Sequence, residues 1–303
     1  MVIFHVDDAG MCYDANLGTI EAIENGVATS MSIMMPCPKA AEMVQYAIAH
    51  PDMDAGIHLT MNAEWAGYRW GPVADKALVP GLVDAEGFLW PGVHSTALHA
   101  RADEVETEIR AQLDRALAMG LEPTHLDTHM GTVFFPTFLR RYVKVGIEKD
   151  IPIMLPAGHL DRITRGLAQE VGKLDAKPGL GAVIANALAH QSYVLLTARV
   201  RRYGRQLWDA GLPVIDDLEA NTSSWGDFEH KKATLILALR TLEPGITQFI
   251  FHCTRPETDF KQISGSWPSR LSDLQVMTDP EVRCVIDEEG IVLTTWRELK
   301  QRR

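Results

Sequence analysis

The stretch Val2-Ile3-Phe4-His5-Val6-Asp7-Asp8 opens the chain with a short apolar run that ends on two acidic residues. An apolar run of this length, closed by charged residues, predicts a buried β-strand. A helical spacing over residues 16–25 follows, and then an apolar run over 28–35, a helical pattern over 39–50 and a third apolar run over 54–60. This strand–helix–strand–helix–strand order predicts a parallel sheet or barrel.

The same alternation continues along the rest of the chain. Helical patterns cover residues 104–119, 137–148, 182–211 and 228–242, and short strands are predicted at 124–128, 151–155, 212–215, 246–252 and 290–295. Residues 62–100 interrupt the rhythm with tryptophans, glycines and prolines, which indicates a loop insertion, either functional or covering a sheet edge. Since no repeat or linker is evident, we expect residues 1–303 to form one domain that carries this insertion.

Composition limits the classes of partner. The 303 residues are 46% hydrophobic and 23% charged, as in an ordinary globular protein, and their net charge is −11 without any basic stripe for phosphates. Four scattered cysteines favour a reducing compartment, and no apolar stretch approaches the roughly 20 residues that span a bilayer. We therefore expect a cytoplasmic protein that binds neither nucleic acid nor membrane; self-association into a homo-oligomer stays open.

Polar side chains gather where the predicted strands end. In parallel α/β proteins the carboxyl ends of the strands face the active site, so these side chains are expected to meet at one mouth. Two of them, His125 and Asp127, are two positions apart and share a strand face. The candidate residues are Asp7, Asp8, His58, His125, Asp127, His129 and His252.

Each candidate alone has an ordinary structural explanation. Adjacent carboxylates can form a simple acidic turn, and a single histidine on an apolar strand is usually a hydrogen-bonded core residue. Together they favour a catalytic site over separate structural roles, because two imidazoles and one carboxylate form a facial metal site with coordination positions open to water. A remaining carboxylate and a remaining histidine can then act as base and acid. The combination predicts a metal-dependent hydrolase.

Eight stretches of the chain form a set of motifs: Asp7-Asp8-Ala9-Gly10, Asn16 to Ala22, Asn25 to Ser30, Gly56-Ile57-His58-Leu59-Thr60, Pro123 to His129, Thr247 to His252, Ser269 to Leu274 and Gly290 to Leu293. Together these motifs resemble those of the YdjC-like carbohydrate deacetylases, which include the chitooligosaccharide deacetylases. The resemblance covers most of the chain except roughly residues 62–100 and 156–210.

The resemblance implies an α/β fold, a distorted (β/α) barrel of TIM-like type as in polysaccharide deacetylases. It also implies one divalent metal ion, magnesium or zinc, and removal of an N-acetyl group from a small amino sugar or oligosaccharide by an activated water. The implied roles are metal ligation by Asp8, His58 and His129, base catalysis by Asp7, acid catalysis by His252, and support behind the ligands by His125 and Asp127.

Three positions depart from the family pattern, namely Ala9, Gly131 and Cys253, and they affect the expected shape of the substrate pocket. Two other functions stay open. One is a different metal-dependent hydrolase on a barrel fold, either a phosphoesterase, which would use Arg255 or Arg270 to hold phosphate, or a hydrolase of other amides. The other is a sugar-binding barrel without turnover. Loop tryptophans at 65, 90 and 225 could stack on a sugar ring, although packing of the insertion is the explanation we favour.

Overall fold

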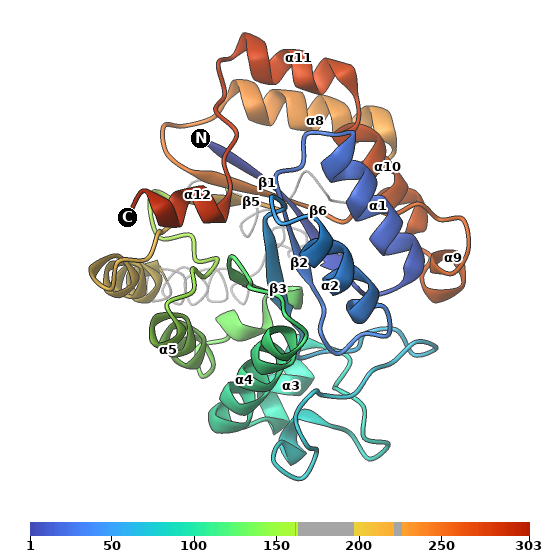
Figure 1. Cartoon of the computed structure of the whole chain (residues 1–303), viewed down its shortest axis with the longest axis vertical. Coiled ribbons are helices and arrows are strands. Elements are labelled where there is room, and N and C mark those ends of the chain that lie inside the picture. Colours follow the sequence, from blue (N-terminus) through green and yellow to red (C-terminus); the bar gives the residue numbers. More distant parts are fainter. Residues whose placement is uncertain (161, 163–196, 221–225) are drawn as a thin grey trace, which may run out of the picture.

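The structure is a computed structural model that describes residues 1–160, 162, 197–220 and 226–303. At its centre six parallel strands lie in the order β4-β3-β2-β1-β6-β5, surrounded by helices (Figure 1). The strands are β1 (Val2–Ala9), β2 (Ser30–Ile33), β3 (Ala55–Leu59), β4 (Leu126–Thr128), β5 (Asp217–Glu219) and β6 (Thr247–Phe251).

The sheet curls until one segment bridges its two edges. On one side, Met154 N donates to Leu126 O of β4 at 2.8 Å. On the other, Ala157 N donates to Ile215 O, just before β5, at 3.0 Å. The ring that results is a distorted α/β barrel, which confirms the predicted fold class.

Three of the predicted strands form no regular strand in the described part of the chain. The segments at 151–155 and 290–295 contribute only isolated bridges, from Ile153 to Leu126 and from Leu293 to Val2. The strand predicted at 212–215 is wrong, because β5 begins at Asp217 and Ile215 forms a single bridge. Pro213 lies inside the predicted segment and has no N–H to donate to a ladder.

Five helices confirm predicted segments, and further helices, most of them near the C-terminus, were not predicted. Those that match predicted segments are α1 (Tyr13–Glu24), α2 (Ala40–Ala49), α4 (Ala102–Ala118), α5 (Leu139–Lys149) and α8 (Phe228–Arg240). Those that were not predicted are α3 (Val93–His99), α9 (Phe260–Ile263), α10 (Trp267–Met277), α11 (Pro280–Glu288) and α12 (Trp296–Gln301), with the 3-10 turns η1 (Pro80–Leu82) and η2 (His129–Phe134). Of the helix predicted at 182–211, residues 197–209 are helical and the part before 197 lies outside the described residues.

The segment 62–100, predicted as a loop insertion, is held against α4 by a buried carboxylate. The two carboxylate oxygens of Glu108 accept from the backbone N–H groups of Val73 and Ala74, each at 2.9 Å. Trp70 donates its indole N–H to the Asn62 carbonyl at 2.8 Å. These bonds tie a segment with little regular structure to the barrel next to the carboxyl end of β3.

Side chains that alternate along the strands pack into two separate hydrophobic cores. On β1, Val2, Phe4 and Val6 pack outward under the helices, whereas Ile3 joins Ile250 and Trp296 inside the barrel. Because side chains alternate along a strand, His5 and Asp7 follow Ile3 on the inner face. The interior is therefore apolar at one end of β1 and polar towards the other, where the site lies.

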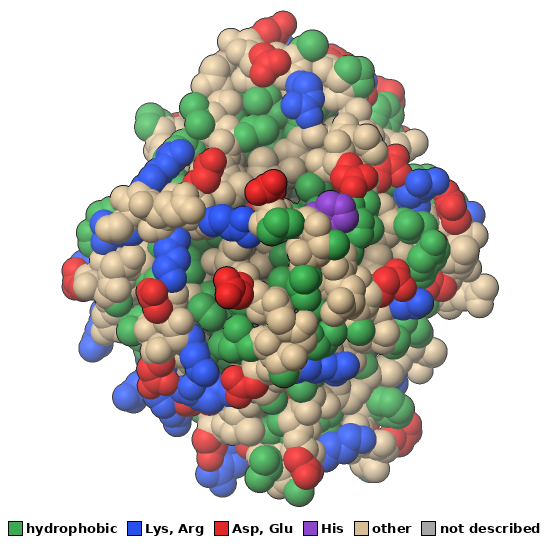
Figure 2. Space-filling view, in the orientation of Figure 1, with side chains coloured by type: hydrophobic (Ala, Val, Ile, Leu, Met, Phe, Trp, Pro, Cys, Tyr) green, Lys and Arg blue, Asp and Glu red, His purple; other side chains and the backbone are tan. Residues whose placement is uncertain are grey.

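The surface carries charges of both signs. Lys and Arg lie interspersed with Asp and Glu over the face drawn in Figure 2. Within the described ranges, no helix combines the length and the apolar character needed to cross a membrane.

Candidate active site

Three of the predicted ligands converge at the carboxyl ends of β1, β3 and β4. Asp8 Oδ1 lies 3.3 Å from His58 Nε2 and 3.1 Å from His129 Nδ1. All three side chains are buried, and one donor atom from each lies within 4.8 Å of the others. Two imidazoles and a carboxylate at this spacing fit a single divalent ion.

The backbone explains how two consecutive carboxylates enter one site. Successive side chains of a regular strand point to opposite faces. Here the pairing of β1 with β2 is irregular between Val6 and Ala9, and Asp8 has φ of +64°, in the left-handed region. This local turn lets the Asp8 side chain reach His58 although Asp7 also faces the barrel interior.

Asp7 and His252 lie side by side next to this triad. Asp7 Oδ2 is 3.8 Å from His252 Nε2 and 3.9 Å from His58 Nε2. His252 follows β6, and its backbone N–H donates to Asp273 on α10 at 3.0 Å. Burial and the nearby Arg270 lower the pKa of His252 to about 4, so this ring is neutral at pH 7.

Asp127 fixes the His58 ring from behind. Its Oδ1 lies 2.8 Å from His58 Nδ1, and its Oδ2 accepts from Ser32 Oγ at 2.7 Å. Burial alone would raise the pKa of Asp127, but the neighbouring His58 and His5 rings hold it well below its usual range. A carboxylate on Nδ1 leaves Nε2 of His58 directed at Asp8, as in carboxylate–histidine–metal arrangements.

His125 lies one layer deeper in the barrel. Its ring stacks on Trp296 with centroids 5.3 Å apart and lies edge-on to His5 at 5.1 Å. Its Nδ1 pairs with Thr124 Oγ1 at 3.0 Å. Gly56 makes room for it, because a Cβ at that position would come within 2.4 Å of the ring.

The burial of His125 predicts a pH-dependent contribution to stability. Burial, with a smaller effect of His5, lowers its pKa from 6.5 to about 4. The unfolded state therefore binds more protons than the native state between these values, so stability is full above pH 6.5 and falls as pH drops towards 4. From pH 7.5 to 5.5 the loss is expected to be about 1 kcal/mol.

We expect the variant His125→Leu to lose this part of the pH dependence. Urea unfolding of both proteins at pH 7.5 and 5.5 measures it, since other titrating groups affect both alike. The variant should have the smaller free energy of unfolding at pH 7.5. The difference in this free energy between wild type and variant should be about 1 kcal/mol smaller at pH 5.5. An unchanged gap would contradict the prediction.

Three further charged residues reach the site. On α10, Arg270 Nη1 pairs with Asp8 Oδ2 at 2.7 Å, and in the insertion Glu64 Oε2 lies 3.0 Å from His129 Nε2. His5 contacts Asp7 at 3.2 Å. The sequence indicated Arg270 only as a candidate phosphate ligand, and Glu64 and His5 were not predicted as site residues. The available signal was the position of His5, two residues before Asp7 on the same strand face.

A cavity of about 320 Å³ adjoins the site. It is lined by Trp65, His252, Ser264, Ser266, Ser269, Arg270 and Asp273. Trp65 lies edge-on to Trp70 and beneath the Arg270 guanidinium, whereas Trp90 stacks on His99 inside the insertion. Trp225 lies outside the described residues.

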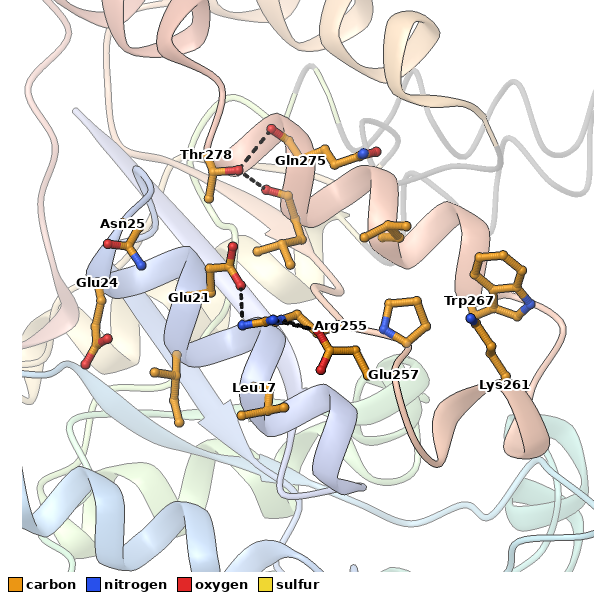
Figure 3. Close-up of a pocket in the computed structure, with 14 residues that line it drawn as sticks. Leu17, Glu21, Glu24, Asn25, Arg255, Glu257, Lys261, Trp267, Gln275 and Thr278 are labelled. Atoms are coloured by element: carbon orange, nitrogen blue, oxygen red, sulfur yellow. Dashed lines mark hydrogen bonds and ion pairs between the residues drawn. The ribbon is translucent and has the colours of Figure 1, made fainter.

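A second cavity, of about 630 Å³, lies between α1 and α10. Figure 3 shows Arg255 there between Glu21 and Glu257, and Lys261 beside Trp267. Its lining includes none of the predicted metal or acid–base residues. Arg255 is therefore engaged outside the barrel mouth.

Comparison with known proteins places the chain among relatives of matching length. A carbohydrate deacetylase of Geobacillus stearothermophilus is 36% identical over 296 residues, which cover 98% of this chain and 96% of that protein. A carbohydrate deacetylase of Thermoanaerobacter pseudethanolicus is 23% identical over 299 residues, 99% of each chain. A chitooligosaccharide deacetylase of Yersinia enterocolitica is 26% identical over 212 residues, 67% of this chain and 77% of that protein.

A solved structure shares the fold. A protein of Enterococcus faecalis described as a cellobiose-phosphate cleavage protein superposes with a TM-score of 0.72 at 21% identity, over 98% of both chains. At the level of sequence, the model of the YdjC-like protein family matches residues 1–288, which include every residue of the site. The chain therefore belongs to the YdjC-like family.

Proposed function

We propose that this protein is a metal-dependent hydrolase that removes an N-acetyl group from a small amino sugar or oligosaccharide. The observation that carries the proposal is the convergence of Asp8, His58 and His129, with Asp7 and His252 beside them at one barrel mouth. The relatives named as carbohydrate deacetylases supply the substrate class.

The donor set suits one divalent ion, magnesium or zinc. Asp8, His58 and His129 would hold it, and when bound the ion would polarise the acetamide carbonyl and make a water molecule more acidic. Imidazole ligands favour zinc, whereas the carboxylate is compatible with either ion.

The chain's own residues would move the protons. Asp7 takes a proton on Oδ2 as the water oxygen attacks the carbonyl carbon. Because the low pKa of His252 keeps its ring neutral at rest, we propose that His252, whose Nε2 lies 3.8 Å from Asp7 Oδ2, receives this proton from Asp7 through one water molecule. It then delivers the proton to the departing nitrogen as the C–N bond breaks, which yields acetate and a free amino sugar.

Charge at the mouth supports this reaction over phosphate ester hydrolysis. A phosphoesterase needs a cation that is available to the phosphate. Arg270 pairs with Asp8, and Arg255 pairs with Glu21 and Glu257 at the cavity between α1 and α10. We also propose that residues 1–303 form one catalytic domain in which the insertion, through Glu64, forms part of the wall beside His129.

A mass-spectrometric screen tests the proposal. Metal-stripped protein, resupplied in turn with zinc, magnesium, manganese or cobalt, is expected to remove one acetyl group from at least one member of a panel of N-acetylated mono- and disaccharides. The stripped protein without added metal is the control. Phosphate release from generic esters, or sugar binding without acetyl loss across the panel, would overturn the proposal in favour of the two other functions.

A further inference from the structure

A buried histidine lies directly beneath the proposed base. His5 precedes Asp7 by two residues on β1 and shares its inward face. Its side chain is fully buried. Its Nε2 is 2.8 Å from Asp127 Oδ2 and 3.2 Å from Asp7 Oδ1, and its Nδ1 is 3.0 Å from Ser30 Oγ.

This contact distinguishes the two oxygens of Asp7. Oδ1 makes an ion-pair contact with His5 Nε2 at 3.2 Å, and no described residue donates a well-aligned hydrogen bond to it. Oδ2 faces the mouth, between His58 and His252. A carboxylate held by one oxygen presents the other to the reacting water, so the ring below Asp7 determines which oxygen is available.

The same ring joins the base to a metal ligand. Asp127 binds His5 through Oδ2 and His58 through Oδ1, at 2.8 Å in each case. Asp7, His5, Asp127 and His58 therefore form one continuous buried chain of contacts. A displacement of His5 would disturb the orientation of Asp7 and loosen the support of His58.

We propose that His5 is a positioning residue that holds Asp7 by Oδ1 and, through Asp127, couples the orientation of the base to that of His58. The inference rests on the proposed function, because it takes Asp7 as the base. In this role, His5 affects the rate of the chemical step through Asp7 and His58 and does not contact the sugar.

Electrostatics agrees with this placement. Burial opposes a charge on His5, but its contacts with Asp127 and Asp7 raise its pKa to about 9. A positive ring between two buried carboxylates offsets their mutual repulsion, which a neutral side chain of similar size would not do.

Two substitutions of His5 test the role by kinetics. His5→Gln keeps a donor, and His5→Leu removes it. We expect kcat to fall about 10–100-fold in His5→Leu, the range for lost outer contacts of a metal site, and less in His5→Gln, with KM within about twofold of wild type. Gln248→Leu is the matched control, because Gln248 is a buried polar residue of β6 whose Oε1 accepts from the Trp296 indole N–H at 3.1 Å. Wild-type kcat in both His5 variants, or an equal kcat loss in Gln248→Leu, would overturn the inference.

A crystal structure of His5→Gln or His5→Leu gives a readout that does not depend on activity. We expect the Asp7 carboxylate to rotate away from the position that faces His58 and His252, while the strands keep their register. An unmoved Asp7 carboxylate would overturn the inference. If wild-type protein releases no acetate from any sugar, the proposed function fails, and the position of Asp7 in the variant still decides the positioning role.

Discussion

Asp7→Asn is expected to lower the rate of acetate release by about 10²–10⁴-fold, the usual contribution of a general acid or base. The substitution keeps the shape of the side chain and removes its ability to take a proton. Asp7 lies next to His252 and outside the proposed ligand set, in which Asp8 contacts both His58 and His129. The variant should therefore keep the ion and bind the sugar.

Activity and metal content must be measured on the same preparation. Acetate release reports the chemical step, and elemental analysis after dialysis against zinc reports the ion. Full activity in Asp7→Asn would show that another group acts as base. Loss of the ion would show instead that Asp7 is a ligand. Asp7 Oδ2 lies 3.9 Å from His58 Nε2, close enough for both side chains to bind the same ion.

His58→Ala and His129→Ala are expected to lose both the ion and detectable acetate release. Each substitution removes one of the three proposed ligands and leaves the buried Asp8 carboxylate facing fewer partners. Removing a supporting contact in a metal site usually costs about 10–100-fold in affinity or activity, so removing a ligand should cost more. Asp127→Asn loosens His58 without removing it, so its loss of metal affinity or activity should stay within about 10–100-fold.

Thermodynamic linkage provides an independent measurement. An ion that binds only the native state, present at about 100 times its Kd, should stabilise the wild-type protein by about 2.7 kcal/mol. The same zinc concentration should stabilise neither His58→Ala nor His129→Ala. His50→Ala is the control, because His50 is an exposed histidine at the end of α2 whose ring binds the Tyr46 carbonyl. Zinc stabilisation that persists in His58→Ala would place the ion elsewhere.

Strand periodicity and strand direction made much of the site predictable. His58 on β3 and Asp127 on β4 stand on inward faces, and His252 comes directly after β6. Parallel strands end on the same side of a sheet, so polar residues at those ends must share a mouth. For the same reason the sequence alone determined the α/β class and the first five alternating elements.

The tertiary structure alone decided which of these residues touch. β1 lies between β2 and β6, so Asp7 meets His252 from the far end of the chain. No local pattern encodes this neighbourhood, and none indicates that α10 would bring Arg270 to Asp8 or that the insertion would bring Glu64 to His129.

The inward turn of Asp8 is the clearest case of a feature beyond sequence reasoning. A regular strand would have pointed Asp7 and Asp8 to opposite faces, yet both side chains reach the barrel interior, where Asp8 adopts the left-handed region. Alternation in the sequence determined which residues face inward where strands are regular. Packing between distant segments decided the geometry at the irregular end of β1, because contacts there come from β3, η2 and α10 together.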